Sequence, residues 1–244
     1  MRPTGLLSVT FRQLSFEHII NLASKAKLDG IEWGGDVHVL PGDIKEAERI
    51  KKATLDAGLK NFSYGSYWRA NSDPEIIAET AAALGVQWIR VWAGTKGSSV
   101  STKAEREKTI EYLQKLCRCC PEGIQVASEW HCHTLNDCVQ SGIKLLEEVN
   151  EDNFFTYFQR EVRENDRQDN LKDLLALPIE KIRAVHVHYC IGNNRLPLSE
   201  GQDEWQDLFA HIPENIPALL EFVRNDSLEQ FMADAVILRK LSQI

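Results

Sequence analysis

One complete strand–helix–strand unit occupies residues 61–92, which read NFSYGSYWRANSDPEIIAETAAALGVQWIRVW. Both ends of this stretch are short and rich in aromatic or β-branched residues, which favour strands. Between them, Asp73 with Pro74 is a typical start of a helix, and Gly85 is a typical end. Two short strands joined by a helix form the building unit of a parallel sheet.

The same alternation runs through the whole chain. A short apolar run followed by a longer segment with helical spacing occurs eight times, at intervals of roughly 30 residues, the size of one strand-plus-helix unit. The expected strands lie at residues 6–11, 30–33, 61–67, 88–92, 124–130, 154–159, 182–188 and 218–222. A (β/α)8 barrel typically has about 250 residues, and this chain has 244. We therefore predict an α/β fold, a (β/α)8 TIM barrel that forms a single domain over residues 1–244.

An open, doubly wound sheet is the alternative architecture. Such a sheet typically carries a glycine-rich, phosphate-binding turn after its first strand. Here the first expected strand runs into FRQLS at residues 11–15, which contains no glycine. The barrel is therefore favoured over the open sheet.

Charge and cysteine content bear on partners and location. The chain has 28 Lys and Arg against 36 Asp and Glu, a formal net charge of −8, whereas a nucleic-acid partner would need a basic surface. No apolar run approaches the about 20 residues of a membrane span, and the amino terminus lacks the pattern of a signal peptide. Six cysteines, three of them in LCRCCP at 116–121, are expected to be free thiols. These features predict a cytoplasmic protein that binds neither nucleic acid nor a membrane.

Polar and titratable residues gather at the ends of the expected strands. In a (β/α)8 barrel, the carboxyl ends of the strands and the loops that follow them build the active site. The residues found at these positions are Glu32, Asp36, His38, Tyr67, Trp68, Arg69, Arg90, Trp92, Glu129, His131, His133, Gln159, His186, His188, Glu221 and Arg224. We therefore expect the active site at this end of the barrel.

Three of these residues predict a metal site. Burying Glu129, His188 and Glu221 at one barrel mouth without strong partners would cost on the order of several kcal/mol each. Carboxylates and imidazoles are ligands that Mn, Mg, Co and Zn accept. Because residues two apart share a face of a strand, Glu129 points with His131, and His186 with His188. Each pair can offer one residue to a metal and the other to a substrate. A rival site of cysteines and histidines is disfavoured, because those of the fifth and seventh units lack the CxxC spacing of structural zinc sites.

These segments resemble the xylose-isomerase-like TIM barrels, a superfamily of sugar isomerases and epimerases that also contains apurinic endonuclease IV. The resemblance covers essentially the whole chain. It rests on SVTFRQLS (8–15), GIEWGGDVHVLPGD (30–43), RVWAGTKGS (90–98), EWHCHTLND (129–137), VHVHY (185–189), NRLPLSEGQDEW (194–205) and the glutamate of the eighth strand.

The resemblance implies one divalent metal (Mn, Co, Mg or Zn) held by residues of the fifth to eighth strands. Glu129, His188 and Glu221 match the family's ligand positions. On the sixth strand the family has Asp, two further residues and then His, whereas this chain has Thr156 and Gln159 there. Gln159 is then a candidate fourth ligand through its amide oxygen, with water as the alternative.

The resemblance also implies a sugar pocket. Arg195 resembles the family's substrate-binding arginine, and the other candidates for contacts with the sugar are His38, Trp68, Arg69, His131 and His186.

The activity implied is that of a metal-dependent isomerase or epimerase of a sugar or keto sugar. An enediolate would form, and the catalytic residues Glu129 and Glu221 would remove and return the proton next to the carbonyl. The partner implied is a small-molecule sugar, and barrels of this kind often form homodimers. One alternative is a non-catalytic, sugar-binding barrel, which the missing aspartate of the sixth strand supports. An endonuclease IV-like phosphodiesterase is disfavoured by the seven histidines and the net charge of −8.

Overall fold

Eight parallel strands close into a barrel, in the order β1-β10-β7-β6-β5-β4-β3-β2. The structure is a computed structural model and describes residues 1–161 and 167–243. The barrel strands are β1 (Thr4–Leu7), β2 (Gly30–Gly34), β3 (Lys60–Gly65), β4 (Trp88–Val91), β5 (Gln125–Ser128), β6 (Phe154–Gln159), β7 (Ile182–Val187) and β10 (Ala218–Leu220). The predicted (β/α)8 barrel is confirmed.

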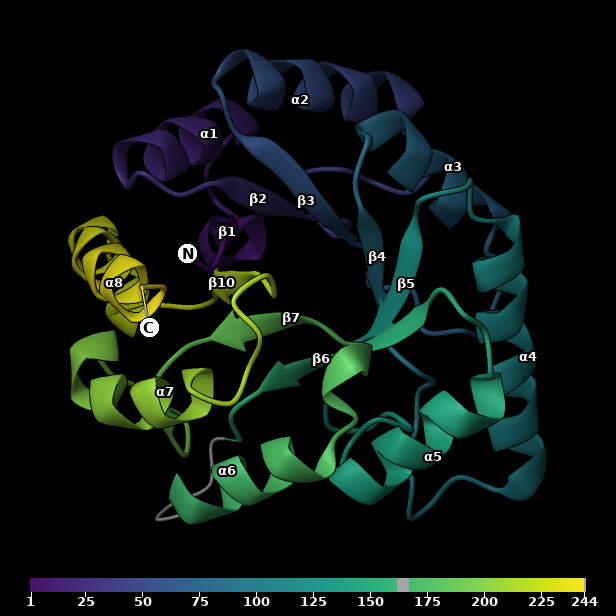
Figure 1. The fold of residues 1–244 in the computed structure, drawn as a ribbon. Coiled ribbons are helices and arrows are strands. Elements are labelled where there is room, and N and C mark those ends of the chain that lie inside the picture. Colours follow the sequence, from purple (N-terminus) through teal and green to yellow (C-terminus); the bar gives the residue numbers. More distant parts are fainter. Residues whose placement is uncertain (162–166, 244) are drawn as a thin grey trace.

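Helices surround this barrel and cover the outer face of its strands (Figure 1). They are α1 (Phe16–Lys25), α2 (Ile44–Asp56), α3 (Glu75–Leu84), α4 (Lys103–Cys119), α5 (Val139–Val149), α6 (Arg167–Ala176), α7 (Gln202–Phe209) and α8 (Leu228–Leu241). A short hairpin of β8 (Cys190–Ile191) and β9 (Asn194–Arg195) follows β7. None of the helices in the described ranges is long and apolar enough to cross a membrane.

The helix signals in the sequence mark the helix ends, although α3 begins one residue later than Asp73 as cap and Pro74 as first helical residue would predict. Before α3, the Asp73 carboxylate accepts a hydrogen bond from the peptide N–H of Glu75 at 3.2 Å, and Pro74 is the N-cap residue. Gly85 ends α3 with a φ of 69°, a left-handed conformation that costs glycine little. At the start of α4, Thr102 and Glu105 exchange side-chain-to-backbone hydrogen bonds in a capping box.

The first strand is shorter than predicted. It ends at Leu7, and Ser8–Phe11 form a fully buried 3-10 helix instead of continuing the strand. The Ser8 hydroxyl accepts a hydrogen bond from the peptide N–H of Gly34 at 2.9 Å. The Ser8 hydroxyl thus takes the place of a backbone carbonyl as the partner of Gly34, and the chain leaves the sheet at this point.

Two apolar clusters lie on either side of the barrel wall. The larger one joins the outer face of the strands to the helices, and includes Phe154. The smaller one fills the barrel interior with residues from most strands, among them Phe62, Trp88, Tyr157 and Leu219. Trp88 therefore lies inside the barrel. Side chains fill the barrel interior below the mouth, so the polar groups at the mouth lie on a packed core.

Candidate metal centre and active site

The two-residue period of the strands directs the polar side chains to the mouth. Trp88 on β4 belongs to the interior cluster, so Arg90 and Trp92 follow it on the same face. On β5, Glu129 follows the interior residue Ala127 in the same way. The corresponding inward positions are Tyr157 and Gln159 on β6, Ala184 and His186 on β7 with His188 just after it, and Leu219 on β10 with Glu221 just after it.

Glu129, His186 and Glu221 form a compact group of candidate metal ligands. One donor atom of each lies within 4.8 Å of the others, and all three side chains are buried. His186 Nδ1 is 3.4 Å from Glu129 Oε1 and 3.6 Å from Glu221 Oε2. The peptide N–H groups of both glutamates donate to backbone carbonyls of the neighbouring strands, those of Val91 and Val187. The hydrogen bonds of the barrel therefore fix the backbone positions of the two glutamates.

Gln159 completes this group. Its Oε1 atom is 3.2 Å from His186 Nδ1, while its Nε2 donates to the Trp130 carbonyl. Three oxygen atoms thus converge on one ring nitrogen, which carries at most one hydrogen to share among them. A cation among these four atoms would satisfy all of them, so the donor set fits a divalent metal.

Thr156 takes no part in the centre. Its hydroxyl donates to the Ser128 carbonyl at 3.2 Å and accepts from Asn136 Nδ2 at 3.1 Å. The residue lies three positions before Gln159 on β6, deeper in the barrel wall. The departure from the family pattern at residue 156 therefore leaves Gln159 as the side chain of β6 that reaches the candidate ligands.

Arg90 holds two carboxylates at the centre of the barrel. Its Nε donates to Glu32 Oε1 at 2.6 Å, and its Nη1 donates to Glu129 Oε2. Trp92 Nε1 donates to the same Glu129 oxygen at 2.5 Å. Glu129 Oε2 is therefore occupied by donors, and the free oxygen, Oε1, is the one that faces His186.

Glu32 is the second carboxylate of this network. Its Oε2 accepts hydrogen bonds from the Ser63 and Tyr157 hydroxyls, both at 2.6 Å. Its burial is nearly complete. Burial opposes its charge, but the attraction of Arg90 outweighs that effect, so the pKa of Glu32 lies well below its usual range. Glu32 is thus a fixed negative charge under the centre.

The three carboxylates differ in how their charges are compensated. Glu129 is also buried, and Arg90 and His186 lower its pKa. Burial raises the pKa of Glu221, and the attraction of His186 offsets this effect only in part. Burial works against the charge of His186, but the attraction of Glu221, Glu129 and Glu32 raises its pKa to about 10. The three carboxylates therefore favour the protonated form of His186 when no metal is bound.

A charge balance supports a divalent ion. When Glu32, Glu129 and Glu221 are all ionised they carry three negative charges, and Arg90 carries one positive charge. With His186 neutral, as a ligand must be, two negative charges remain. A divalent cation would balance this deficit.

His188 lies outside the group of candidate ligands formed in the described part of the chain. It stands two residues further along β7, toward the mouth, and its carbonyl accepts a hydrogen bond from Trp205 Nε1 at 2.9 Å. Its side chain is 7% exposed, and its Nδ1 has no partner. Burial, followed by the charge of Arg160, lowers its pKa to about 3. In the described part of the chain it is thus His186, and not the predicted ligand His188, whose ring lies among the candidate metal ligands.

Tyr67, rather than Trp68, faces the mouth. Tyr67 has a φ of 57°, a left-handed conformation that turns its side chain toward Trp92, with ring centroids 4.9 Å apart. Trp68 is buried in the outer core, and its Nε1 donates to the Ser72 hydroxyl at 3.1 Å. The structure does not bring Trp68, a predicted sugar contact, to the candidate centre, because the reversed backbone at Tyr67 shifts the alternation by one residue.

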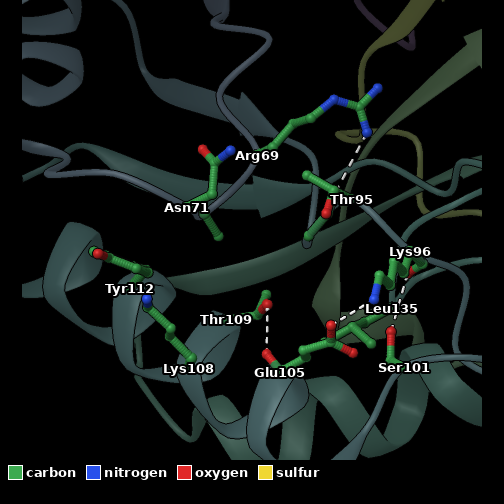
Figure 2. Close-up of a pocket in the computed structure, with 12 residues that line it drawn as sticks. Arg69, Asn71, Thr95, Lys96, Ser101, Glu105, Lys108, Thr109, Tyr112 and Leu135 are labelled. Atoms are coloured by element: carbon green, nitrogen blue, oxygen red, sulfur yellow. Dashed lines mark hydrogen bonds and ion pairs between the residues drawn. The ribbon is translucent and has the colours of Figure 1, made fainter.

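Arg69 lies beside Trp92 at the barrel mouth. It also lines a small pocket that is separate from the pocket beside the candidate centre. Its guanidinium lies 4.1 Å from the centroid of the Trp92 ring, and donates to the Gly94 carbonyl at 3.4 Å. The second pocket, of about 150 Å³, lies against α4. Figure 2 shows Arg69 reaching past Thr95 on one side of this pocket, with Lys108 on the other. The predicted role of Arg69 in substrate binding is consistent with its place beside Trp92.

The remaining predicted contacts lie at different depths. His131 stacks on Trp92, with ring centroids 4.4 Å apart. Arg195 forms an ion pair with Asp226 at 2.5 Å. His38 is buried, with Nε2 3.0 Å from the Leu14 carbonyl. His131 therefore contacts Trp92, which donates to Glu129, while His38 is held by the backbone of another loop.

A pocket of about 650 Å³ opens directly beside the candidate centre, and we name it the mouth pocket. It lies between the loops that follow β4, β5 and β6 and the end of β7. Its walls include Val100, Trp130, His131, Asp137, Gln159 and His188. Gln159 belongs both to this pocket and to the ligand group, so the two are continuous.

Several residues of the centre have no role predicted from the sequence, among them Arg90 and Tyr157. Arg90 was placed at a strand end, and Tyr157 was not a candidate. The signal was available for Arg90, because Trp88 and Trp92 flank it at two-residue intervals on an inward face. Tyr157 had no comparable signal, since buried tyrosines are common in barrel cores.

Fold and site together define a class: a (β/α)8 barrel with two carboxylates, an imidazole and an amide converging at its mouth. A family model described as xylose isomerase-like TIM barrel matches residues 20–221. The chain belongs to this family.

The relatives of known sequence and structure include enzymes. The 3-dehydroshikimate dehydratase of Bacillus anthracis is 28% identical over 163 residues, which are 61% of this chain and 58% of that protein. The chain thus spans less than two thirds of the length of this curated relative.

Three solved structures illustrate the likeness of fold. A probable 3-DHS dehydratase from Bacillus anthracis has a TM-score of 0.77 at 21% identity, covering 98% of this chain and 99% of that chain. A D-allulose 3-epimerase from Methylomonas sp. has a TM-score of 0.71 at 17% identity, covering 99% and 98%. The IOLI protein with a bound zinc atom has a TM-score of 0.76 at 15% identity, covering 99% and 98%. At these identities the likeness concerns the fold alone.

Proposed function

We propose that this protein is a metal-dependent isomerase or epimerase that acts on a sugar or keto sugar. The observation that carries the proposal is the convergence of Glu129, His186 and Glu221 within 4.8 Å at the barrel mouth, with Gln159 beside them. These four residues would hold one divalent ion, which would be Mn, Co, Mg or Zn. Bound there, the ion would polarise a carbonyl and stabilise the negative charge that develops on its oxygen.

Glu221 is the better placed of the two glutamates to take a proton. Glu129 Oε2 already accepts hydrogen bonds from Arg90 and Trp92. Among the described residues, no hydrogen-bond donor engages the Glu221 carboxylate, whose nearest cation is His186 at 3.6 Å. We therefore assign to Glu221 the removal of the proton next to the carbonyl, and to Glu129 its return.

A dehydratase is the second candidate, because the relative with 28% identity is a 3-dehydroshikimate dehydratase. The first step would be the same, since Glu221 would again remove a proton next to a carbonyl. The reactions would differ afterwards, because a hydroxyl group would leave from the adjacent carbon as water. The substrate would be a small molecule in either case, and a cytoplasmic location and a homodimer stay predictions.

The shared proton step gives the test. The Mn-loaded protein is incubated in D2O with D-fructose, other keto sugars and 3-dehydroshikimate, and deuterium at the carbon next to the carbonyl is followed by NMR. We expect exchange with at least one compound, and a loss of at least about 100-fold in Glu221→Gln, the usual size of a general-base effect. If no compound exchanges its proton although metal is bound, the catalytic proposal is wrong and a sugar-binding barrel becomes the better account.

A further inference from the structure

Resting on the proposed function, we infer that the mouth pocket binds an uncharged, hydroxyl-rich substituent of the substrate. The protein would then act on a keto sugar or keto polyol that carries a second sugar or similar polyol group, rather than on a sugar phosphate. Two polar atoms without a partner, the size of the pocket and its charge support this inference.

The first unpartnered atom is His188 Nδ1. The His188 side chain is 93% buried and lines the mouth pocket. No hydrogen-bond partner for Nδ1 exists in the described structure. A buried polar atom without a partner destabilises the folded protein, so a ring nitrogen in this position is suited to a ligand hydroxyl.

The second unpartnered atom is Asp137 Oδ1, which is also buried. The other oxygen of this carboxylate accepts a hydrogen bond from the peptide N–H of Ser98 at 2.8 Å. Gly97 makes that contact feasible, because a Cβ at this position would lie 2.8 Å from Asp137 Oδ2. The loop after β4 thus holds the carboxylate by one oxygen and leaves the other as an acceptor. A carboxylate oxygen only accepts, so its partner must be a donor such as a hydroxyl.

The charge of the pocket opposes an anionic ligand. The described lining residues include one guanidinium, that of Arg160, and no ammonium group. Arg160 Nε is 3.1 Å from Glu204 Oε1, and its Nη1 donates to the Cys190 carbonyl. Its charge is therefore compensated within the protein, while Asp137 contributes a negative charge. A phosphate or carboxylate here would lack a counter-ion.

The size of the pocket favours a ligand that extends beyond the metal centre. A volume of about 650 Å³ falls in the roughly 300–1,000 Å³ of sites for drug-sized molecules. Trp130 and Val100 give it an apolar wall against which the C–H face of a sugar ring can pack. With the keto group at Gln159, a substituent of the substrate would reach toward Asp137.

Three keto sugars that differ at one position test the inference. D-Fructose, D-fructose 6-phosphate and 6-O-α-D-glucopyranosyl-D-fructose share the keto end and carry at C6 a hydroxyl, a phosphate and a neutral sugar. Their affinities for the Mn-loaded protein are measured by isothermal titration calorimetry. We expect the glucosyl compound to bind about tenfold more tightly than fructose, as two added hydrogen bonds allow, and the phosphate to bind more weakly than fructose.

Variants connect this preference to the pocket. Asp137→Asn and His188→Ala should each lose most of the advantage of the glucosyl compound, and in Asp137→Asn fructose affinity and bound manganese should change less than about twofold. Asp137→Asn should also weaken the discrimination against the phosphate. Asp152→Asn, which makes the same change in a groove before β6, is the control and should leave all three affinities unchanged.

The outcomes separate the inference from the proposed function. Tightest binding of the phosphate, or no gain for the glucosyl compound, overturns the inference even if metal binding and proton exchange are intact. A protein that holds no manganese but still binds the glucosyl compound through Asp137 would retain the pocket and lose the proposed function. If none of the three sugars binds, the inference is wrong.

Discussion

His186 and His188 differ in depth by one step of the strand period, and that step determines which of them lies among the carboxylates. His186 Nδ1 lies within 3.6 Å of oxygen atoms of Gln159, Glu129 and Glu221. A sequence motif with two histidines on the same strand face does not distinguish them. The surrounding side chains do, because three acceptors surround one histidine and none is bonded to Nδ1 of the other.

The metal content of two variants tests this assignment. His186→Ala should lose the bound divalent ion, since it removes one of four donors and the one on which the others converge. His188→Ala should retain about one ion per chain. Plasma mass spectrometry on protein purified without a histidine tag measures both. Loss of metal in His188→Ala with retention in His186→Ala would restore the assignment made from the sequence.

Arg90 is the residue on which the buried charges depend. Its guanidinium is 2% exposed and contacts both Glu32 and Glu129. Arg90→Met would leave two buried carboxylates without their counter-charge, which should cost about 3–5 kcal/mol of unfolding free energy. Urea denaturation measures this loss. Adding Glu32→Gln to that variant should recover part of it, whereas a purely steric role of Arg90 would give no recovery.

At the scale of elements, the strand–helix units were predictable because their signals are local. Asp73, Pro74 and Gly85 delimit α3 from a few neighbouring residues. The turn at Tyr67 was not predictable, because a left-handed conformation at a non-glycine residue depends on its tertiary surroundings. Because of this conformation at Tyr67, Trp68 lies outside the expected pocket. The carboxylates Glu129 and Glu221 were predictable as site residues, since strand ends and a two-residue period suffice to place them.

The capping box of α4 is an element whose contribution can be measured. Thr102 accepts a hydrogen bond from the Glu105 peptide N–H, and the Glu105 carboxylate accepts one from Thr102. Thr102→Ala should lower the unfolding free energy by about 1 kcal/mol. Guanidinium denaturation checks the value, and Thr102→Ser should stay close to the wild type. An equal loss in both variants would mean that the hydroxyl is not the stabilising group.

At the scale of the whole molecule, the contribution of His38 to stability should decrease in mild acid. Burial lowers the pKa of His38 below its usual 6.5. Below that pH the unfolded chain takes up a proton that the folded chain binds more weakly, so stability falls as the pH decreases from about 6.5. Melting temperatures between pH 7.5 and 5.5 should therefore fall less steeply in His38→Gln than in the wild type. Parallel curves would show that His38 titrates alike in both states.

The balance of charges around Arg90 has a consequence for how the protein acquires its metal. Arg90 and a protonated His186 together offset two of the three buried carboxylates. We therefore expect the barrel to fold without an ion, unlike small zinc domains whose folding and metallation are one event. Metal would then bind to the folded barrel, and a proton on His186 would have to leave before the ring could act as a ligand. The metal found in the protein would then reflect the supply of ions after folding.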